Sequence, residues 1–439
     1  MERKKTSQGL IALRPFNFVV VFWGGKFRDF FLNLCLPSLL APHNVPHLKD
    51  INKSRLIICS TKEDWEAIQP SVLLDKIKEY LELIFLDIGF PGKGDLPQLH
   101  MSKGHKAAIQ WIWKRGEYGI FLAPDLVLSD GSIARITQLA QGGKKAVLAV
   151  ALRFDMDKCV NEFKDRGLMR SNESLILPPR VLAEIAATSL HSEIQRFNWD
   201  SPYFCNYPIS VYFSVPHETG IVVNSCSWAM VLVDFVEIKQ LNDCSLDENT
   251  IDAHFIHQNL FQLHKTEKMH LITDSDEMLF VSLTSELDMS MYPLQEERIN
   301  GIPLLGNLKK FMAVNLVLHS NVMDPFKRWA FKKDVVIHGG DLSGNWERIR
   351  MRSQRLARLS VGRLAIVGLM VGAIAPFIHG PYLAFIRVRD GMCRNLRDSR
   401  EFQSVDVRFY RRVFIFLRVF FTLVLKKIVR KKEAKEFLV

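Results

Sequence analysis

A short apolar run from Gly119 to Ala123 stops abruptly at Pro124-Asp125, and a second acid, Asp130, follows five residues later. The run has the length and composition of a buried strand, so its end brings a carboxylate to the carboxyl edge of a sheet. Ligands bind at that edge in open α/β sheets, and hard divalent cations prefer oxygen ligands. The pattern predicts an α/β sheet in which Asp125 can hold a cation against a phosphate.

Similar apolar runs recur along the first third of the chain and alternate with segments of helical character. The predicted strands are Asn17–Trp23, Arg55–Ser60, Leu83–Asp87, Gly119–Ala123 and Lys145–Leu152, and the predicted helices lie around Phe27–Leu40, after Asp64 and over His105–Lys114. Continuous apolar strands separated by helices are typical of a mainly parallel sheet covered on both faces. Further along, a helix over Ser174–His191 and a strand pair at Ile209–Val215 and Thr219–Asn224 are predicted.

The length of 439 residues predicts more than one structural unit. We expect residues 1–155 to form a nucleotide-binding α/β half, 156–345 the acceptor-side half of the same catalytic domain, and 346–439 a basic amphipathic helical tail. Seven scattered cysteines without a CxxC pair favour reduced cytosolic thiols. The first apolar run, Phe18 to Trp23, is shorter than a signal-peptide core, so export by that route is not expected.

The basic charge is confined to the end of the chain. Residues 347–439 hold 21 of the 58 Lys and Arg and 7 of the 47 Asp and Glu, a net charge of +14 against −3 for the rest. The segment 364–386 contains no Asp, Glu, Lys or Arg, although it has two prolines and three glycines. A membrane span, a packed helical domain, a nucleic-acid-binding surface and a peripheral membrane contact are the alternatives. Apolar blocks without base-stacking alternation favour an anionic membrane surface over nucleic acid.

Several motifs together resemble bacterial glycosyltransferases with a GT-A fold. They are the strand-Trp-Gly start from Phe18 to Gly24, the Leu-Pro-Ser-Leu-Leu segment at Leu36–Leu40, and Lys103-Gly-His105 ahead of Phe-Leu-Ala-Pro-Asp125. The resemblance implies a GT-A-like, Rossmann-type sheet with an Asp-x-Asp element that binds Mn²⁺ or Mg²⁺ on the donor diphosphate. Here that element is Ala123-Pro124-Asp125, which keeps only the second acid. Asp130 is the candidate for the missing metal ligand, or else it caps the next helix.

The same resemblance implies roles for four further residues. Trp23 and Gly24 would lie under the donor nucleotide, where glycine permits close approach of a ligand to the backbone. Lys103 and His105 would approach the phosphates or the sugar. A plain strand-to-helix turn and a solvated helix start are the alternative interpretations of these two pairs.

Three polar clusters later in the chain are candidates for chemistry. Asp252 is the candidate general base, which must reach the acceptor hydroxyl, and the nearby His254 and His257 have the spacing of paired metal ligands. A solvated acidic loop is the alternative. The segment Thr273–Glu277 is either a cation-binding cluster or a polar turn, and His338 is a candidate late metal ligand.

The expected function is therefore transfer of a sugar from a nucleotide-diphosphate donor to a glycan or lipid-linked acceptor in cell-envelope polysaccharide synthesis. The expected location is cytoplasmic, on the inner face of the plasma membrane. Because the first acid of the motif is missing, the alternative is a non-catalytic sugar- or lipid-binding scaffold of the same fold.

Overall fold

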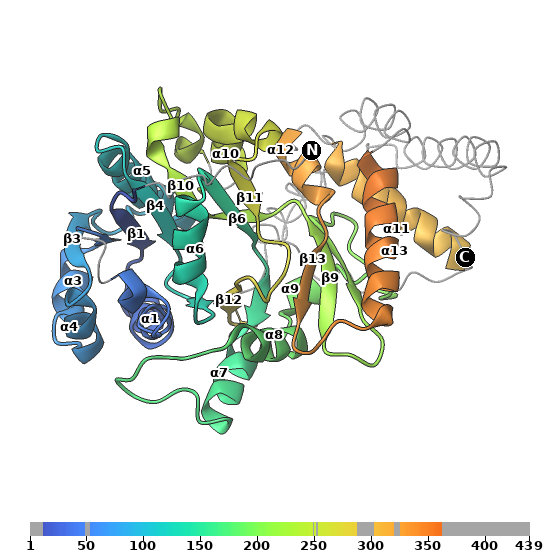
Figure 1. The fold of residues 1–439 in the computed structure, drawn as a ribbon, viewed down its shortest axis with the longest axis horizontal. Helices are drawn as coiled ribbons and strands as arrows, with labels where there is room; N and C mark the ends of the chain where they lie inside the picture. The colour runs from blue at the N-terminus through green and yellow to red at the C-terminus, as the bar shows by residue number, and fades with distance from the viewer. Residues whose placement is uncertain are drawn as a thin grey trace, which may run out of the picture. The chain divides into compact units, whose positions relative to one another are not determined.

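The computed structural model describes residues 12–48, 53–248, 250–251, 253–287, 303–319 and 325–361 (Figure 1). Two compact units are present. The larger takes in the described residues of 1–201, 209–294 and 324–357, and the smaller those of 202–208, 295–323 and 358–439. In the smaller unit, helix α11 (Pro303–Leu318) ends beside His319, whose Nε2 lies 3.2 Å from the carbonyl oxygen of Ser360.

A seven-stranded sheet forms the centre of the larger unit, with the strand order β11-β6-β10-β4-β1-β2-β3. Its strands are β1 (Phe16–Val21), β2 (Arg55–Ser60), β3 (Glu82–Asp87), β4 (Tyr118–Leu122), β6 (Ala146–Val150), β10 (Trp228–Asp234) and β11 (Met269–Leu271). All strand pairings are parallel except those of β10, which runs antiparallel to both β4 and β6. The predicted α/β class with a mainly parallel sheet is confirmed.

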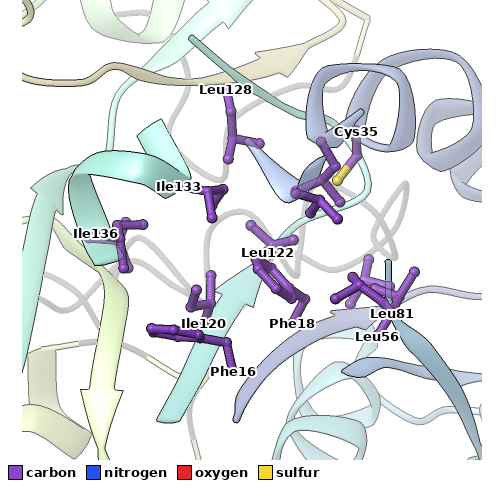
Figure 2. Close-up of a cluster of buried hydrophobic side chains, with 14 of the residues drawn as sticks. Phe16, Phe18, Cys35, Leu56, Leu81, Ile120, Leu122, Leu128, Ile133 and Ile136 are labelled. Atoms are coloured by element: carbon purple, nitrogen blue, oxygen red, sulfur yellow. The ribbon is translucent and has the colours of Figure 1, made fainter. Parts of the chain in front are cut away.

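Both faces of the sheet are covered. Successive side chains of each strand point to opposite faces, so each strand contributes to two packed layers. One face of β1 carries Phe16 and Phe18, which belong to a core cluster with residues of α6 (Ser132–Gln141). Figure 2 shows this cluster, in which Ile120 and Leu122 of β4 lie near Ile133 and Ile136. The helix α1 (Gly25–Phe30) has no buried residue and leads into the π-helical turn η1 (Phe31–Cys35) and α2 (Leu36–Leu39), which both contribute buried side chains to the same cluster.

The opposite face packs against α5 (Pro97–Trp113), whose Ala108, Ile109 and Ile112 are buried. The helix lies directly against the sheet at Gly104, where an added Cβ would lie 2.6 Å from Cγ1 of Val21 and 3.1 Å from Cβ of Cys59. Glycine therefore fixes how closely this helix approaches β1 and β2.

Two three-stranded sheets extend the unit. One has the order β5-β12-β7, with β5 (Leu126–Leu128), β12 (Phe280–Thr284) and β7 (Arg153–Asp155). The other has the order β13-β9-β8, with β13 (Val335–His338), β9 (Gly220–Ser225) and β8 (Ser210–Ser214). Since β5 begins just after the end of β4, the first small sheet continues the carboxyl edge of the main sheet.

The remaining helices and turns connect these layers. They are α3 (Lys62–Ile68), α4 (Val72–Lys78), α7 (Met156–Asp165), α8 (Pro179–Thr188), α9 (Ser192–Gln195), α10 (Ala253–Leu260), α12 (Pro325–Phe331) and α13 (Gly344–Val361), with short turns η2 (Val45–Leu48), η3 (Phe235–Glu237), η4 (Cys244–Asp247) and η5 (Phe261–Lys265).

Some element boundaries differ from the sequence predictions. The helix predicted over His105–Lys114 begins at Pro97, because proline is well suited to a first helical turn. The helix predicted over Ser174–His191 is shorter, Pro179–Thr188, since it too starts only at a proline and ends before Ser189. The six cysteines in the described residues are free. Among the described helices, none combines the length and apolar character needed to cross a membrane, and residues 364–386 lie outside the description.

Candidate functional site at the carboxyl edge of the sheet

The carboxyl ends of the central strands bring the predicted donor-site residues to one edge. In the register between β1 and β4, Val20 lies opposite Leu122. The segments that follow, Trp23-Gly24 after β1 and Asp125 after β4, therefore leave the sheet on neighbouring strands, which lie about 4.8 Å apart. The structure thus places Trp23, Gly24 and Asp125 at the edge where open α/β sheets bind ligands.

The turn after β1 is held in place by a buried acid. Gly24 has a positive φ of 79°, and nothing lies within 4 Å of where its Cβ would be. Its backbone N–H donates to Oδ2 of Asp64 at 2.7 Å, and Arg28 donates to Oδ1 of the same carboxylate at 3.2 Å. The ring of Trp23 packs edge-on against His100, with 4.7 Å between ring centroids. A preformed turn with open space above a glycine allows a ligand to approach the backbone.

Lys103 and His105 lie in α5 and differ in exposure. Lys103 is exposed and donates from Nζ to the carbonyl oxygen of Ile88 at 3.2 Å. His105 is buried, its ring lies edge-on to Phe121, and its Nδ1 has no hydrogen-bond partner among the described residues. Burial lowers the pKa of His105 to about 4, so the imidazole is neutral at pH 7. The structure therefore gives Lys103 access to a ligand and gives His105 a place in the core.

Asp125 occupies the junction between the main sheet and the β5-β12-β7 sheet. Its side chain is half-buried and accepts a hydrogen bond from Oγ of Ser282 at 3.3 Å, while its carbonyl oxygen accepts from the N–H of Leu283 at 3.0 Å. The position of the missing acid, Ala123, offers no ligand. Asp125 is thus a partly accessible carboxylate whose backbone is fixed by β12.

Asp130 lies beyond β5 and holds a neighbouring loop. Its Oδ1 accepts from the backbone N–H of His43 and its Oδ2 contacts Nδ1 of the same histidine, both at 2.8 Å. It makes no capping hydrogen bond to α6, whose N-cap residue is Gly131. A cation at Asp130 would therefore have to compete with His43.

A second polar cluster joins the segment after the edge strand β11 to the end of β13. Asp274 and Asp276 follow β11, His338 ends β13, and their ligating atoms all lie within 4.8 Å of one another. The main chain of Asp274 forms a bridge with Val336, which explains how residues so far apart in sequence meet. Two strands lie between β11 and β4, so the strands that lead to this cluster and to Asp125 are roughly 14 Å apart across the sheet.

The hydrogen bonds of His338 give this cluster its chemical character. Its ring is buried, with Nδ1 2.5 Å from the carbonyl oxygen of Gly340 and Nε2 3.1 Å from Oδ1 of Asp274. Both neighbours are acceptors, so the ring carries two protons or offers one nitrogen to a cation. The hydrogen bond to Asp274 raises the pKa of His338, and the same bond lowers the pKa of Asp274.

Arg180 is the cation already beside this cluster. It donates to Asp276 at 2.9 Å and to Asp341 at 2.6 Å, and hydrogen bonding to Asp276 raises the pKa of Arg180. Two carboxylates and an imidazole also suit Mn²⁺ and related divalent ions. Sequence reasoning identified both halves of this cluster but had no means of joining them.

The remaining predicted residues are not brought into either group. Asp252, the predicted base, lies outside the described residues. In α10, Nε2 of His254 lies 3.3 Å from the Gln258 amide, and the ring of His257 packs on Phe261. No group of three ligating side chains in the described part of the chain includes either histidine.

The chain is only weakly similar to known proteins, in sequence and in structure. No protein-family model matches the chain, and no curated protein matches it in sequence. S. aureus TarS is 11% identical with a TM-score of 0.23, covering 40% of this chain and 34% of its own. Mouse xyloside xylosyltransferase 1 is 13% identical with a TM-score of 0.24, and the match covers 36% of this chain and 61% of the mouse protein. A Bacillus anthracis protein described as a glucose-1-phosphate thymidylyltransferase, in complex with sucrose, is 12% identical with a TM-score of 0.29. That match covers 58% of this chain and 85% of the Bacillus protein.

The chain thus spans less than two thirds of the length of the first two proteins. At these TM-scores the likenesses carry no argument about activity, which must come from the site.

Proposed function

We propose that the protein is a glycosyltransferase that takes its sugar from a nucleotide-diphosphate donor bound at the carboxyl edge of the main sheet. The observation that carries the proposal is the placement of the open Gly24 turn and the accessible Asp125 on neighbouring strands at that edge. Trp23 and Lys103 border the same edge and would contact the base and the phosphates.

Asp125 is the residue that would hold Mn²⁺ or Mg²⁺ against the diphosphate. The Asp125–Asp130 pair suits a cation less well, because both oxygens of Asp130 already contact His43. One carboxylate is nevertheless enough, since Mg²⁺ is commonly bound by one or two carboxylates with substrate phosphates and water. When bound, the ion would stabilise the negative charge that develops on the leaving diphosphate.

Calorimetric titration with UDP, GDP and CDP, each with and without Mn²⁺, tests the donor site. We expect one nucleotide to bind with Mn²⁺ dependence, and Asp125→Asn to weaken this binding at least tenfold, since the cation loses its protein ligand. Asp87→Asn is the matched control, because Asp87 ends β3 at the same edge, is exposed, and accepts a hydrogen bond from the backbone N–H of Gly89, with Nζ of Lys62 4.0 Å away. It should bind as the wild type does.

Asp276→Asn separates the two candidate cation positions. If Mn²⁺ dependence survives Asp125→Asn and disappears in Asp276→Asn, the cation belongs to the Asp274–Asp276–His338 cluster. If the wild type binds none of the three nucleotides, the glycosyltransferase proposal fails and the sugar- or lipid-binding scaffold takes its place.

The acceptor side of the proposal rests on the basic tail. A glycan or lipid-linked acceptor for envelope polysaccharide would lie at an anionic membrane surface, and residues 347–439 would contact the cytoplasmic leaflet. Within the described part, α13 carries five arginines, of which Arg348 and Arg358 are exposed. Basic residues near such a surface each contribute about 1 kcal/mol of attraction. Absence of sedimentation with anionic vesicles would remove the membrane from this proposal.

A further inference from the structure

The outward face of α5 forms one wall of a cavity in the larger unit, and the short turn η4 forms the opposite wall. On α5 the cavity is lined by exposed residues that recur three or four positions apart, as on one face of a helix, among them Lys103, Ala107 and Gln110. On η4 it is lined by the buried Leu246 and the exposed Asp247. The cavity has a volume of about 400 Å³, which is within the range of small-molecule sites.

Side-chain contacts between the two walls form the cavity before any ligand binds. Nζ of Lys106, which also lines it, donates to Oδ1 of Asp247 at 2.7 Å and lies 3.7 Å from Oδ1 of Asp243. Nε2 of Gln110 donates to Oδ2 of Asp243 at 2.8 Å. The charge of Lys106 is therefore balanced by the segment that it faces. A ligand that enters does not have to order these walls, which favours its binding.

Lys103 is the cation of this cavity that pairs with no carboxylate among the described residues. Its Nζ donates to the carbonyl oxygen of Ile88, the residue directly after β3, at 3.2 Å. The ammonium thus lies at the carboxyl edge of the main sheet, the edge of the proposed donor site. An ammonium has three donors, and Lys106 already faces two carboxylates. Lys103 can in the same way serve a donor phosphate and an anion in the cavity.

The other lining residues suit a sugar better than a nucleobase. Leu99, Ala107 and Leu246 offer apolar surface to the C–H groups of a sugar ring. The amide oxygen of Gln110 and the exposed carboxylate of Asp247 can accept hydrogen bonds from hydroxyls. None of the described residues that line the cavity is aromatic, whereas bases are commonly held by stacking on aromatic side chains. One cation without a carboxylate partner matches one acidic group on the ligand.

We propose that this cavity binds an acidic saccharide, a sugar that carries a carboxylate or a phosphate group, as part of the acceptor glycan; this rests on the proposed function. The acidic group would contact Lys103, and the hydroxyls would contact Gln110 and Asp247. The cavity would hold the glycan away from its reacting end. It would thereby select which glycan is extended and take no part in making or breaking bonds.

Ligand-observed NMR of the full-length protein tests the cavity with hexuronates, hexose 6-phosphates and the corresponding neutral hexoses, each in the gluco, galacto and manno configurations. We expect an acidic sugar to bind about tenfold more tightly than its neutral counterpart, because it gains a charge-assisted hydrogen bond. Its affinity should fall as salt is added, since the ammonium is exposed. Comparison of the uronates with the phosphates identifies the acid that the cavity prefers.

Ala107→Phe fills the cavity from an exposed position, and Ala67→Phe, on α3 and outside the cavity, is the matched control. We expect Ala107→Phe to weaken binding of the acidic sugar by about tenfold or more, because the ring takes its space. Nucleotide binding should not change, since Ala107 lies one helical turn farther from the carboxyl edge than Lys103. Ala67→Phe should bind both ligands as the wild type does. Ala107→Glu should weaken the acidic sugar more than Ala107→Gln, because only glutamate adds a like charge.

The outcomes separate this inference from the proposed function. If no acidic sugar binds the wild type more tightly than its neutral counterpart, or if Ala107→Phe binds it as the wild type does, the cavity is not an acidic-saccharide site. Loss of nucleotide binding in Ala107→Phe would make the cavity part of the donor site and would equally overturn the inference. If the acidic sugar binds as expected and UDP, GDP and CDP do not, the glycosyltransferase proposal has failed and the cavity belongs to a sugar-binding scaffold.

Discussion

His105 shows how one residue can satisfy a motif and still serve the core. The pKa of its imidazole is lowered to about 4 by burial, against 6.5 for an ordinary histidine. Above pH 6.5 the ring is neutral in both folded and unfolded chains. Between pH 6.5 and 4 only the unfolded chain takes up the proton, so stability falls as the pH falls through this window. Across this window the free energy of unfolding falls by about 3 kcal/mol.

Urea unfolding at several pH values between 4 and 7 measures this effect at the residue scale. We expect His105→Leu to flatten the pH dependence of the free energy of unfolding, because leucine takes up no proton and fills the same buried space beside Phe121. The exposed His47 offers a matched change, His47→Leu, which should leave the slope unchanged. Equal slopes for wild type and His105→Leu would show that this imidazole is not the titrating group.

Residue-level chemistry was only partly predictable from the sequence. Asp125 could be placed because its own strand delivers it to the sheet edge. The contact of Asp130 with His43 spans 87 positions, and that of His338 with Asp274 spans 64, so neither is encoded in a local pattern. Such contacts depend on which strands lie side by side, and a single sequence does not specify this.

At the scale of elements, the approach of α5 to the sheet depends on one glycine. A Cβ at position 104 would lie 2.6 Å from Cγ1 of Val21, a buried β-branched side chain with little freedom to move. Alanine would raise helix propensity by about 1 kcal/mol, but overpacking typically costs about 1 to 3 kcal/mol. We therefore expect Gly104→Ala to lower the melting temperature measured by circular dichroism. Gly344→Ala, at a helical site with nothing within 4 Å, should not lower it. A Gly104→Ala protein as stable as wild type would mean that α5 can shift.

The strands of the first third were predictable because each is a continuous apolar run between helices. Strand β10 was not predicted, although Trp228–Asp234 is also apolar and buried. It lies far along the chain and enters the middle of the sheet antiparallel, between β4 and β6. The alternation of strand and helix that identified the other members gives no sign of such an insertion.

At the scale of the whole molecule, the start of α13 belongs to the core of the larger unit. Trp346, Ile349 and Leu356 are buried, and a Cβ at Gly220 would lie 2.4 Å from the Trp346 ring. Glu218 accepts a hydrogen bond from the Trp346 indole. Burial of large apolar side chains contributes about 1.5 to 3 kcal/mol each, which in sum is comparable to the total stability of a typical domain, about 5 to 15 kcal/mol.

Two truncations test where the folded unit ends. A chain that stops at Val361 keeps every described core residue of the larger unit, which ends at Ala357. We expect it to melt cooperatively and to bind the same nucleotide as the full chain, but to lose sedimentation with anionic vesicles because most of the basic tail is gone.

A chain that stops at Ser343 loses Trp346, Ile349 and Leu356, and we expect it to be unfolded or rapidly degraded in limited proteolysis. If the shorter chain melts as the longer one does, α13 contributes nothing essential to the core. If the longer one still sediments with anionic vesicles, the membrane contact lies elsewhere in the protein.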